Sequence, residues 1–203
     1  FVPTEDASAE LKRYRAGELD LTATVPLESY QWAEENLPDE LRKSPSLGVY
    51  YYALNTALPK FADPRVRRAL AMAIHREIIT GKITRAGEAP AYGWVPLGTS
   101  GYDVAARVGW AELEGPKRVA EARRLMLAAG YGPDNPLGVE LLYNTSEGHK
   151  KIAIAIAAMW KALGVKVTLR NEEWKVYLSS RNRGDFEISR AGQNPIQPDV
   201  AFM

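Results

Sequence analysis

The sequence predicts a mixed α/β fold, because helix-like and strand-like segments alternate in it and one strand-helix-strand unit is complete. The two strands are expected at Leu137 to Tyr143 and at Val165 to Leu169, where aliphatic residues dominate. Between them, residues 147–163 carry apolar side chains at helical spacing. Such a unit joins parallel strands by a helical crossover, so the class is α/β or α+β.

The first 54 residues predict two short helices and two strands. Residues 5–16 form a polar helical pattern that ends at Gly17, and residues 19–23 alternate in polarity like a half-buried strand. Pro26 suits the first turn of a helix that Pro38 stops. Residues 47–54, with three consecutive tyrosines, have strand character, and we assign the tyrosines mainly to structure.

Two amphipathic helices are expected in the middle of the chain. One starts at Asp63-Pro64 and extends to about Thr80, since Asp accepts from free backbone N–H groups and Pro is favoured in the first turn. The other covers residues 116–129 and ends at Gly130. The Gly- and Pro-rich residues 87–102 between them predict a surface loop. A helix at 174–181 and a strand at 186–189 follow.

Composition narrows the classes of function. Hydrophobic residues make up 46% and charged residues 25% of 203, as in a folded globular domain. Lys and Arg number 26 against 25 Asp and Glu, so no net field favours nucleic acid or acidic lipid. The sequence has no Cys and only two His, and these are too few of the usual ligands to favour a zinc site. The N-terminus lacks Met and signal-peptide features, which indicates an excised piece.

No motif prepares a nucleophile or binds a cofactor. The sequence contains no G-x-S-x-G, G-x-x-x-x-G-K-[ST] or G-x-G-x-x-G pattern. An α/β hydrolase is therefore disfavoured, although Ser, His and Asp all occur, and we expect a protein that is not an enzyme and has no cofactor.

Five segments together resemble one protein family. They are YYYALNT at 50–56, FADPRVRRALAMAIHREII at 61–79, APAYGWVP at 89–96, AEARRLMLAAGY at 120–131 and the stretch from LLYNTSEGHKK to EEWKVYL at 141–178. The chain resembles the extracellular solute-binding proteins of the peptide and nickel class, family 5, and within it the oligopeptide-binding proteins of bacterial ABC importers.

The resemblance implies a class II periplasmic-binding-protein fold, in which two lobes close over a ligand. Residues 1–26 would then belong to the first lobe and hinge, and residues 27–203 would form most of the second lobe, truncated at its C-terminal end. It implies a peptide ligand, an ABC permease as partner, a complementary segment outside this chain, and a periplasmic or lipid-anchored location. The alternative is an isolated lobe that binds no ligand by itself.

The resemblance also implies which residues bind. Arg190, Arg181 and His149 match positions where family members place cations near a peptide carboxylate, and Trp174 matches a position that lines a side-chain pocket. Each of the four has a structural alternative. Arg190 would anchor a strand end, Arg181 would be a solvated helix end, His149 would sit in a first helical turn, and Trp174 would pack in the core.

Some positions depart from the family pattern. Ile196 stands where an Asp receives the peptide ammonium group, Gln193 replaces a usual Trp, and Asp199 is displaced by three residues. Thr84 and Ala53 replace a Lys and an acidic residue. These departures predict an unusual peptide ligand or lost binding.

Overall fold

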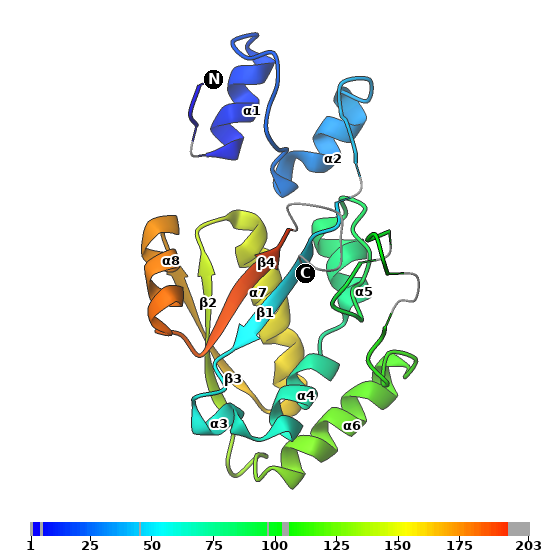
Figure 1. Ribbon diagram of the computed structural model, residues 1–203, viewed down its shortest axis with the longest axis vertical. Helices are drawn as coiled ribbons and strands as arrows, with labels where there is room; N and C mark the ends of the chain where they lie inside the picture. Colours follow the sequence, from blue (N-terminus) through cyan, green and yellow to red (C-terminus); the bar gives the residue numbers. More distant parts are fainter. Residues whose placement is uncertain (1, 5, 45, 97, 103–105, 195–203) are drawn as a thin grey trace.

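The computed structural model contains a four-stranded sheet with helices on both faces and a small helical unit beyond one end (Figure 1). The described residues are 2–4, 6–44, 46–96, 98–102 and 106–194. The elements are α1 (Ala7–Arg15), α2 (Leu27–Asn36), β1 (Val49–Leu54), α3 (Pro59–Ala62), α4 (Pro64–Met72), α5 (Arg76–Ile78), the π-helix η1 (Ile79–Thr84), α6 (Gly115–Ala128), β2 (Gly138–Asn144), α7 (Glu147–Trp160), the 3-10 helix η2 (Lys161–Leu163), β3 (Lys166–Glu172), α8 (Trp174–Arg183) and β4 (Ile188–Gln193).

The sheet has the strand order β1-β4-β2-β3. β2 is parallel to both β3 and β4, whereas β1 is antiparallel to β4. The predicted unit of strand, helix and parallel strand is thus confirmed as β2, α7 and β3. Because of these directions, the carboxyl ends of β2 and β4 lie at the same end of the sheet as the start of β1. The candidate site is built at that end.

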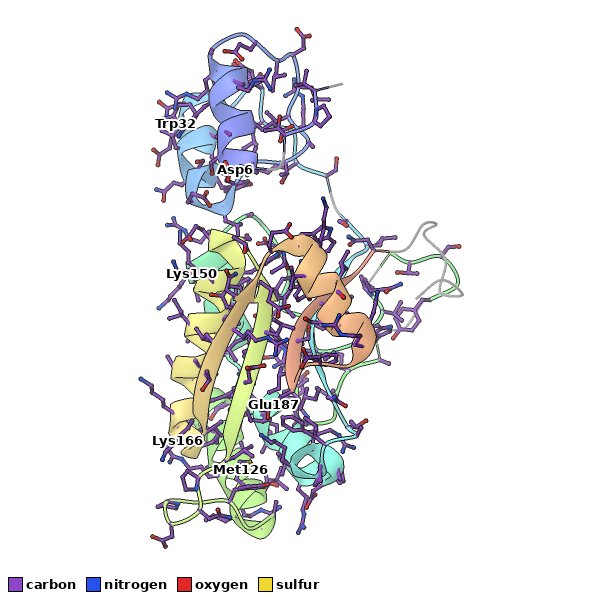
Figure 2. The ribbon with its side chains drawn as sticks, turned by 90° about the vertical axis from the view of Figure 1, so that its left-hand side faces the viewer. Asp6, Trp32, Met126, Lys150, Lys166 and Glu187 are labelled. Atoms are coloured by element: carbon purple, nitrogen blue, oxygen red, sulfur yellow. The ribbon has the colours of Figure 1, made fainter. Side chains whose placement is uncertain are left out.

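The two faces of the sheet are covered by different helices: α7 lies on one face and α8 on the other (Figure 2). The main core lies on the α7 face, where Leu141 and Ile188 of the sheet are buried with Ile156 of α7. Trp160, at the end of α7, is 2% exposed and its indole N–H donates to the Leu70 carbonyl oxygen at 2.9 Å. This bond joins α7 to α4, while the core contacts hold α7 against the sheet.

The helical unit at the N-terminus contacts the rest of the chain through α2. Within the unit, Ser8 donates to Glu28 at 2.8 Å, and the Arg15 guanidinium lies 4.1 Å from the centre of the Trp32 ring. Toward α7, Leu27 packs on Gly148 so closely that a Cβ added at Gly148 would lie 2.6 Å from Leu27 Cδ1. The lobe boundary at residue 26 stays a prediction. The contacts connect α2 to α1, which precedes residue 26, and to α7, which follows it.

Two expected elements are wrong. Residues 19–23 form no strand: Leu21 is 81% exposed and none of the described strands pairs with them, so their alternating polarity has no sheet to enter. The helix expected from 63 to 80 ends at Met72 and resumes at Arg76. His75 between them has extended backbone, and its N–H donates to the Met159 sulfur at 3.3 Å. A tertiary contact therefore replaces the continuous helical ladder.

Candidate functional site

The candidate site begins with the register between β1 and β4. Tyr52 is the partner of Arg190, and Tyr50 is the partner of Gly192. Side chains two residues apart on a strand share a face, so Arg190 lies on the same face as buried Ile188, toward α7. The register therefore places Tyr50, Tyr52 and Arg190 together above the core.

Tyr50 contacts two of the three predicted cationic residues, His149 and Arg190. Its hydroxyl oxygen lies 3.3 Å from His149 Nδ1, and the two ring centres are 5.6 Å apart. The Arg190 guanidinium carbon lies 5.0 Å from the centre of the Tyr50 ring. A cation at this distance from an aromatic face is attracted by it. We call Tyr50, His149, Arg190 and Asn144 the Arg190 cluster.

Arg190 has polar and aromatic partners but no carboxylate. Its Nη1 donates to Asn144 Oδ1 at 3.4 Å, a long bond, and its Nε is buried without a hydrogen-bond partner among the described residues. None of the ion pairs in that part of the chain includes Arg190 or His149. A partly buried guanidinium in this state retains donors for an anion.

The electrostatics of the cluster follow from burial and from Arg190. Burial, followed by the positive charge of Arg190, lowers the pKa of His149 to about 4. Burial raises the pKa of Tyr50 above its ordinary value, although hydrogen bonding to Tyr52 and the charge of Arg190 act against it. At neutral pH the cluster therefore holds one positive charge, on Arg190, beside a neutral imidazole and a neutral phenol.

Trp174 and Arg181 form a second group on α8, across the sheet. Glu173 caps the helix by accepting from the Lys175 N–H, which places Trp174 in the first turn. Trp174 is 48% exposed and its ring stacks on Tyr177 with centres 5.7 Å apart. The Arg181 guanidinium lies 5.8 Å from the centre of the same Tyr177 ring. Trp174 is therefore an exposed aromatic surface and is not part of the core.

Tyr177 connects the two groups. Its side chain is buried, and its hydroxyl donates to the backbone carbonyl of Arg190. The structure thus brings His149 together with Arg190, and Trp174 together with Arg181, whereas no described contact joins Arg181 to Arg190.

Sequence reasoning missed three residues of this arrangement: Tyr50, Asn144 and Tyr177. A pattern of alternating faces was visible for Tyr50, but its nearness to His149 depends on the β1-β4 register and on the crossover of α7. Thr84, which stands where the family pattern has a Lys, is buried and donates to Glu88 at 2.9 Å. Ile196 and Asp199 lie outside the described residues.

The Arg190 cluster is partly exposed: Tyr50 is 37% exposed, and His149 and Arg190 are half-buried. Two hollows of the described chain lie elsewhere: one is lined by residues of the N-terminal unit such as Tyr14 and Trp32, and the other lies between α4 and α6, beside Trp110. The outer side of the cluster is therefore accessible from solvent.

No group of three or more potential metal-ligating side chains occurs among the described residues. None of the helices there combines the length and the apolar character needed to cross a bilayer.

Comparison with known proteins identifies similar chains. The periplasmic murein peptide-binding protein of Escherichia coli is 46% identical over 192 residues, which cover 94% of this chain and 36% of that protein. A structure of the Escherichia coli murein tripeptide-binding protein matches with a TM-score of 0.93 at 43% identity, covering 100% of this chain and 40% of that one.

Two further solved structures are similar. The oligopeptide-binding protein of Haemophilus influenzae, in complex with the peptide RPPGFSPFR, matches with a TM-score of 0.92 and 34% identity over 100% of this chain and 40% of that one. A periplasmic oligopeptide-binding protein of an oligopeptide ABC transporter from Borrelia burgdorferi matches with a TM-score of 0.84 and 28% identity, covering 98% and 39%. These neighbours confirm the class II periplasmic-binding-protein fold.

The extent of the matches defines what the chain represents. It spans about 36% of the length of the curated relatives, so it corresponds to a portion of such a protein. The family model for the middle part of bacterial extracellular solute-binding proteins, family 5, matches residues 1–203. The chain therefore belongs to the family 5 bacterial extracellular solute-binding proteins.

Proposed function

We propose that this chain supplies one wall of a peptide-binding cleft in the substrate-binding protein of an ABC importer. The observation that carries the proposal is the Arg190 cluster, in which a partly buried guanidinium without a carboxylate partner lies beside His149 and Asn144 at an open end of the sheet. A peptide C-terminal carboxylate has the charge and the acceptors to fill that position. The peptides named with the similar proteins support this choice of ligand.

Trp174 and Arg181 extend the proposed wall on the α8 side. The exposed indole of Trp174 offers a flat apolar surface to varied ligand side chains, and Tyr177 holds it in place by stacking. Arg181 offers a second guanidinium for ligands whose carboxylate ends at a different point. We propose binding without catalysis, since the family and its relatives are binding proteins.

The whole protein, in our proposal, works outside the cytoplasmic membrane. A second lobe, formed by sequence beyond this chain, closes over the peptide, and the closed form is recognised by a membrane permease. The periplasmic names of the relatives and the ABC transporter named for one structural neighbour support this role. Residues 1–26 would belong to that lobe and to the hinge that joins it to residues 27–203.

The test is calorimetric titration of the chain with trialanine and with trialanine amide, which lacks the carboxylate. We expect saturable binding of trialanine and a loss of about 30-fold or more on amidation or in Arg190→Gln, because one partner of a charge pair is removed. Arg183→Gln is the matched control, since Arg183 is exposed on α8 and bonds only to Ser179 in the described structure.

Two results would go against the proposal. Equal binding of trialanine and its amide would show that the carboxylate is not recognised at Arg190. An absence of heat from a chain that still unfolds cooperatively would favour the alternative of a folded lobe with no ligand of its own.

A further inference from the structure

His149 has an unusual position for a residue expected to act as a cation. Its ring lies in the first turn of α7, half-buried, with Nδ1 directed at the Tyr50 hydroxyl. The guanidinium carbon of Arg190 lies 5.0 Å from the centre of the same Tyr50 ring. Tyr50 therefore contacts two groups that would repel each other if both were charged.

The other groups around His149 do not offset that repulsion. From β1, the Tyr52 hydroxyl lies 3.4 Å from that of Tyr50 and is neutral, since burial raises its pKa. On α7, Glu147 and Lys150 form an ion pair with each other at 3.3 Å. From α2, apolar Leu27 packs on Gly148. Nothing described around the imidazole favours its charged form.

From this geometry, and resting on the proposed function, we propose that Tyr50 is a positioning residue which holds His149 uncharged beside Arg190, so that capture of a peptide carboxylate takes up one proton. When Nδ1 carries no proton, the Tyr50 hydroxyl donates to it. The same ring gives the Arg190 guanidinium its aromatic support. A single side chain thus contacts both binding groups.

Proton uptake follows from charge balance. In the free chain, one positive charge faces the site. A carboxylate bound to Arg190 neutralises that charge, which removes the repulsion and adds an attractive partner for an imidazolium ion. A proton from solvent then binds to the imidazole, and no bond in the ligand breaks.

The consequence is a pH-dependent affinity with a defined sign. If the complex binds one more proton than the free chain, affinity rises as pH falls, by up to about tenfold per pH unit. The rise ends near the pKa of the free imidazole, about 4, below which His149 is charged before the ligand arrives. A peptide amide, without the carboxylate, would show no such dependence.

Two measurements on the chain test the proposal. The first is an NMR titration of the imidazole nitrogens in a His75→Gln background, which leaves His149 as the only histidine. We expect His149 to stay neutral at pH 6 in the free chain and to become charged with saturating trialanine. The second is calorimetry in buffers of different ionisation enthalpy, which should report close to one proton taken up per trialanine at pH 6.

Variants separate a positioning role from a merely structural one. In Tyr50→Leu we expect the free His149 to titrate closer to 6.5 and the proton uptake at pH 6 to fall. Tyr50→Phe keeps the ring and removes the hydroxyl, so it preserves folding if the leucine variant does not fold and isolates the hydrogen bond. Tyr51→Leu is the control: its ring packs on Trp94 at 4.7 Å, and the free His149 titration should not change.

Each outcome is decisive. A free His149 that titrates near 6.5, or trialanine binding with no proton uptake, overturns the proposal. A third outcome is that trialanine does not bind, while the pKa of the free His149 is low and rises in the Tyr50 variants. This outcome refutes the proposed function and the coupling to the ligand. It supports the role of Tyr50 in the free chain. Binding with uptake that Tyr50→Phe and Tyr50→Leu leave unchanged refutes the role of Tyr50.

Discussion

Two arginines of the same sheet have opposite surroundings. Arg170 on β3 is paired with three carboxylates: Glu140 at 2.8 Å, Glu172 at 3.1 Å and Asp185 at 3.6 Å. Arg190 on β4 is supported by an aromatic ring and an amide oxygen and by no described carboxylate. Both guanidinium groups are partly buried, so burial does not explain the difference.

The difference separates a structural charge from a binding charge. A cation whose charge is balanced by carboxylates of its own chain, as that of Arg170 is, contributes to stability and offers little to a ligand, even though its Nε, like that of Arg190, lacks a hydrogen bond. A cation left with unused donors at the end of a sheet contributes less to the fold and keeps its interaction energy for an incoming anion. The predictions below test this division by removing each kind of group.

The largest loss of stability is expected for Arg170→Leu. It leaves Glu140, Glu172 and Asp185 close together without a cation, and we expect the free energy of unfolding to fall by about 2 kcal/mol, less than for a completely buried pair because these side chains remain partly exposed. Urea unfolding measures the change. Arg183→Leu, at an exposed position on α8, should change stability by under about 0.5 kcal/mol. Equal losses of stability in the two variants would contradict a structural role for Arg170.

The next effect is expected for Tyr177→Phe. The buried hydroxyl of Tyr177 donates to the Arg190 carbonyl, so its removal leaves that oxygen without this donor and should cost about 1 to 2 kcal/mol in urea unfolding. Tyr30→Phe is the comparison, because the buried Tyr30 hydroxyl makes no hydrogen bond of normal geometry and has only the Lys43 ammonium near it, so its loss should cost less than that of the Tyr177 hydroxyl. The idea that Tyr177 ties α8 to β4 fails if both phenylalanine variants behave alike.

The sequence predicted most of the fold because its signals are local. Asp63-Pro64 begins α4, and Gly164, at φ 74, ends the turn before β3. Spacing of apolar residues identified α6 and α7. It could not show that residues 19–23 lack a partner strand, or that the Met159 sulfur would replace a helical bond at His75. Both outcomes depend on segments far away in the sequence.

The site was predictable only in part for the same reason. Resemblance to the family supplied His149, Arg190, Arg181 and Trp174, and those assignments stay predictions of binding. The role of Tyr50 could not be inferred from the strand pattern, since alternation assigns a face but not a neighbour. Tyr50 and His149 lie 99 positions apart in the sequence, so their distance depends on the β1-β4 register and on the position of α7.

A smaller effect is expected for pH. In the folded chain the pKa of His149 is about 4, below its ordinary value of 6.5, so between these values the unfolded chain binds more protons. Stability should therefore fall as pH is lowered from about 6.5 to about 4, by roughly 1 kcal/mol once the exposed part of the ring is allowed for.

The His149→Gln variant isolates this contribution. Carboxylates also titrate near pH 4, so the quantity of interest is the difference between the two stability curves measured by urea unfolding at each pH. The parent chain should lose more stability than the variant across this window. Parallel curves would mean that His149 is not held neutral by the fold.

The smallest change of stability is expected for Arg190→Leu, because its contributions oppose each other. The substitution removes the attraction between the guanidinium and the Tyr50 ring, but it also removes a buried Nε that has no described partner and a positive charge that disfavours protonation of His149. We expect the free energy of unfolding to change by under about 0.5 kcal/mol, and the pKa of His149 to rise toward its ordinary value, as urea unfolding and an NMR titration can measure. A loss as large as that of Arg170→Leu would make Arg190 a structural residue. A small loss combined with the raised pKa would instead mean that the fold keeps this cation for a partner outside the described chain.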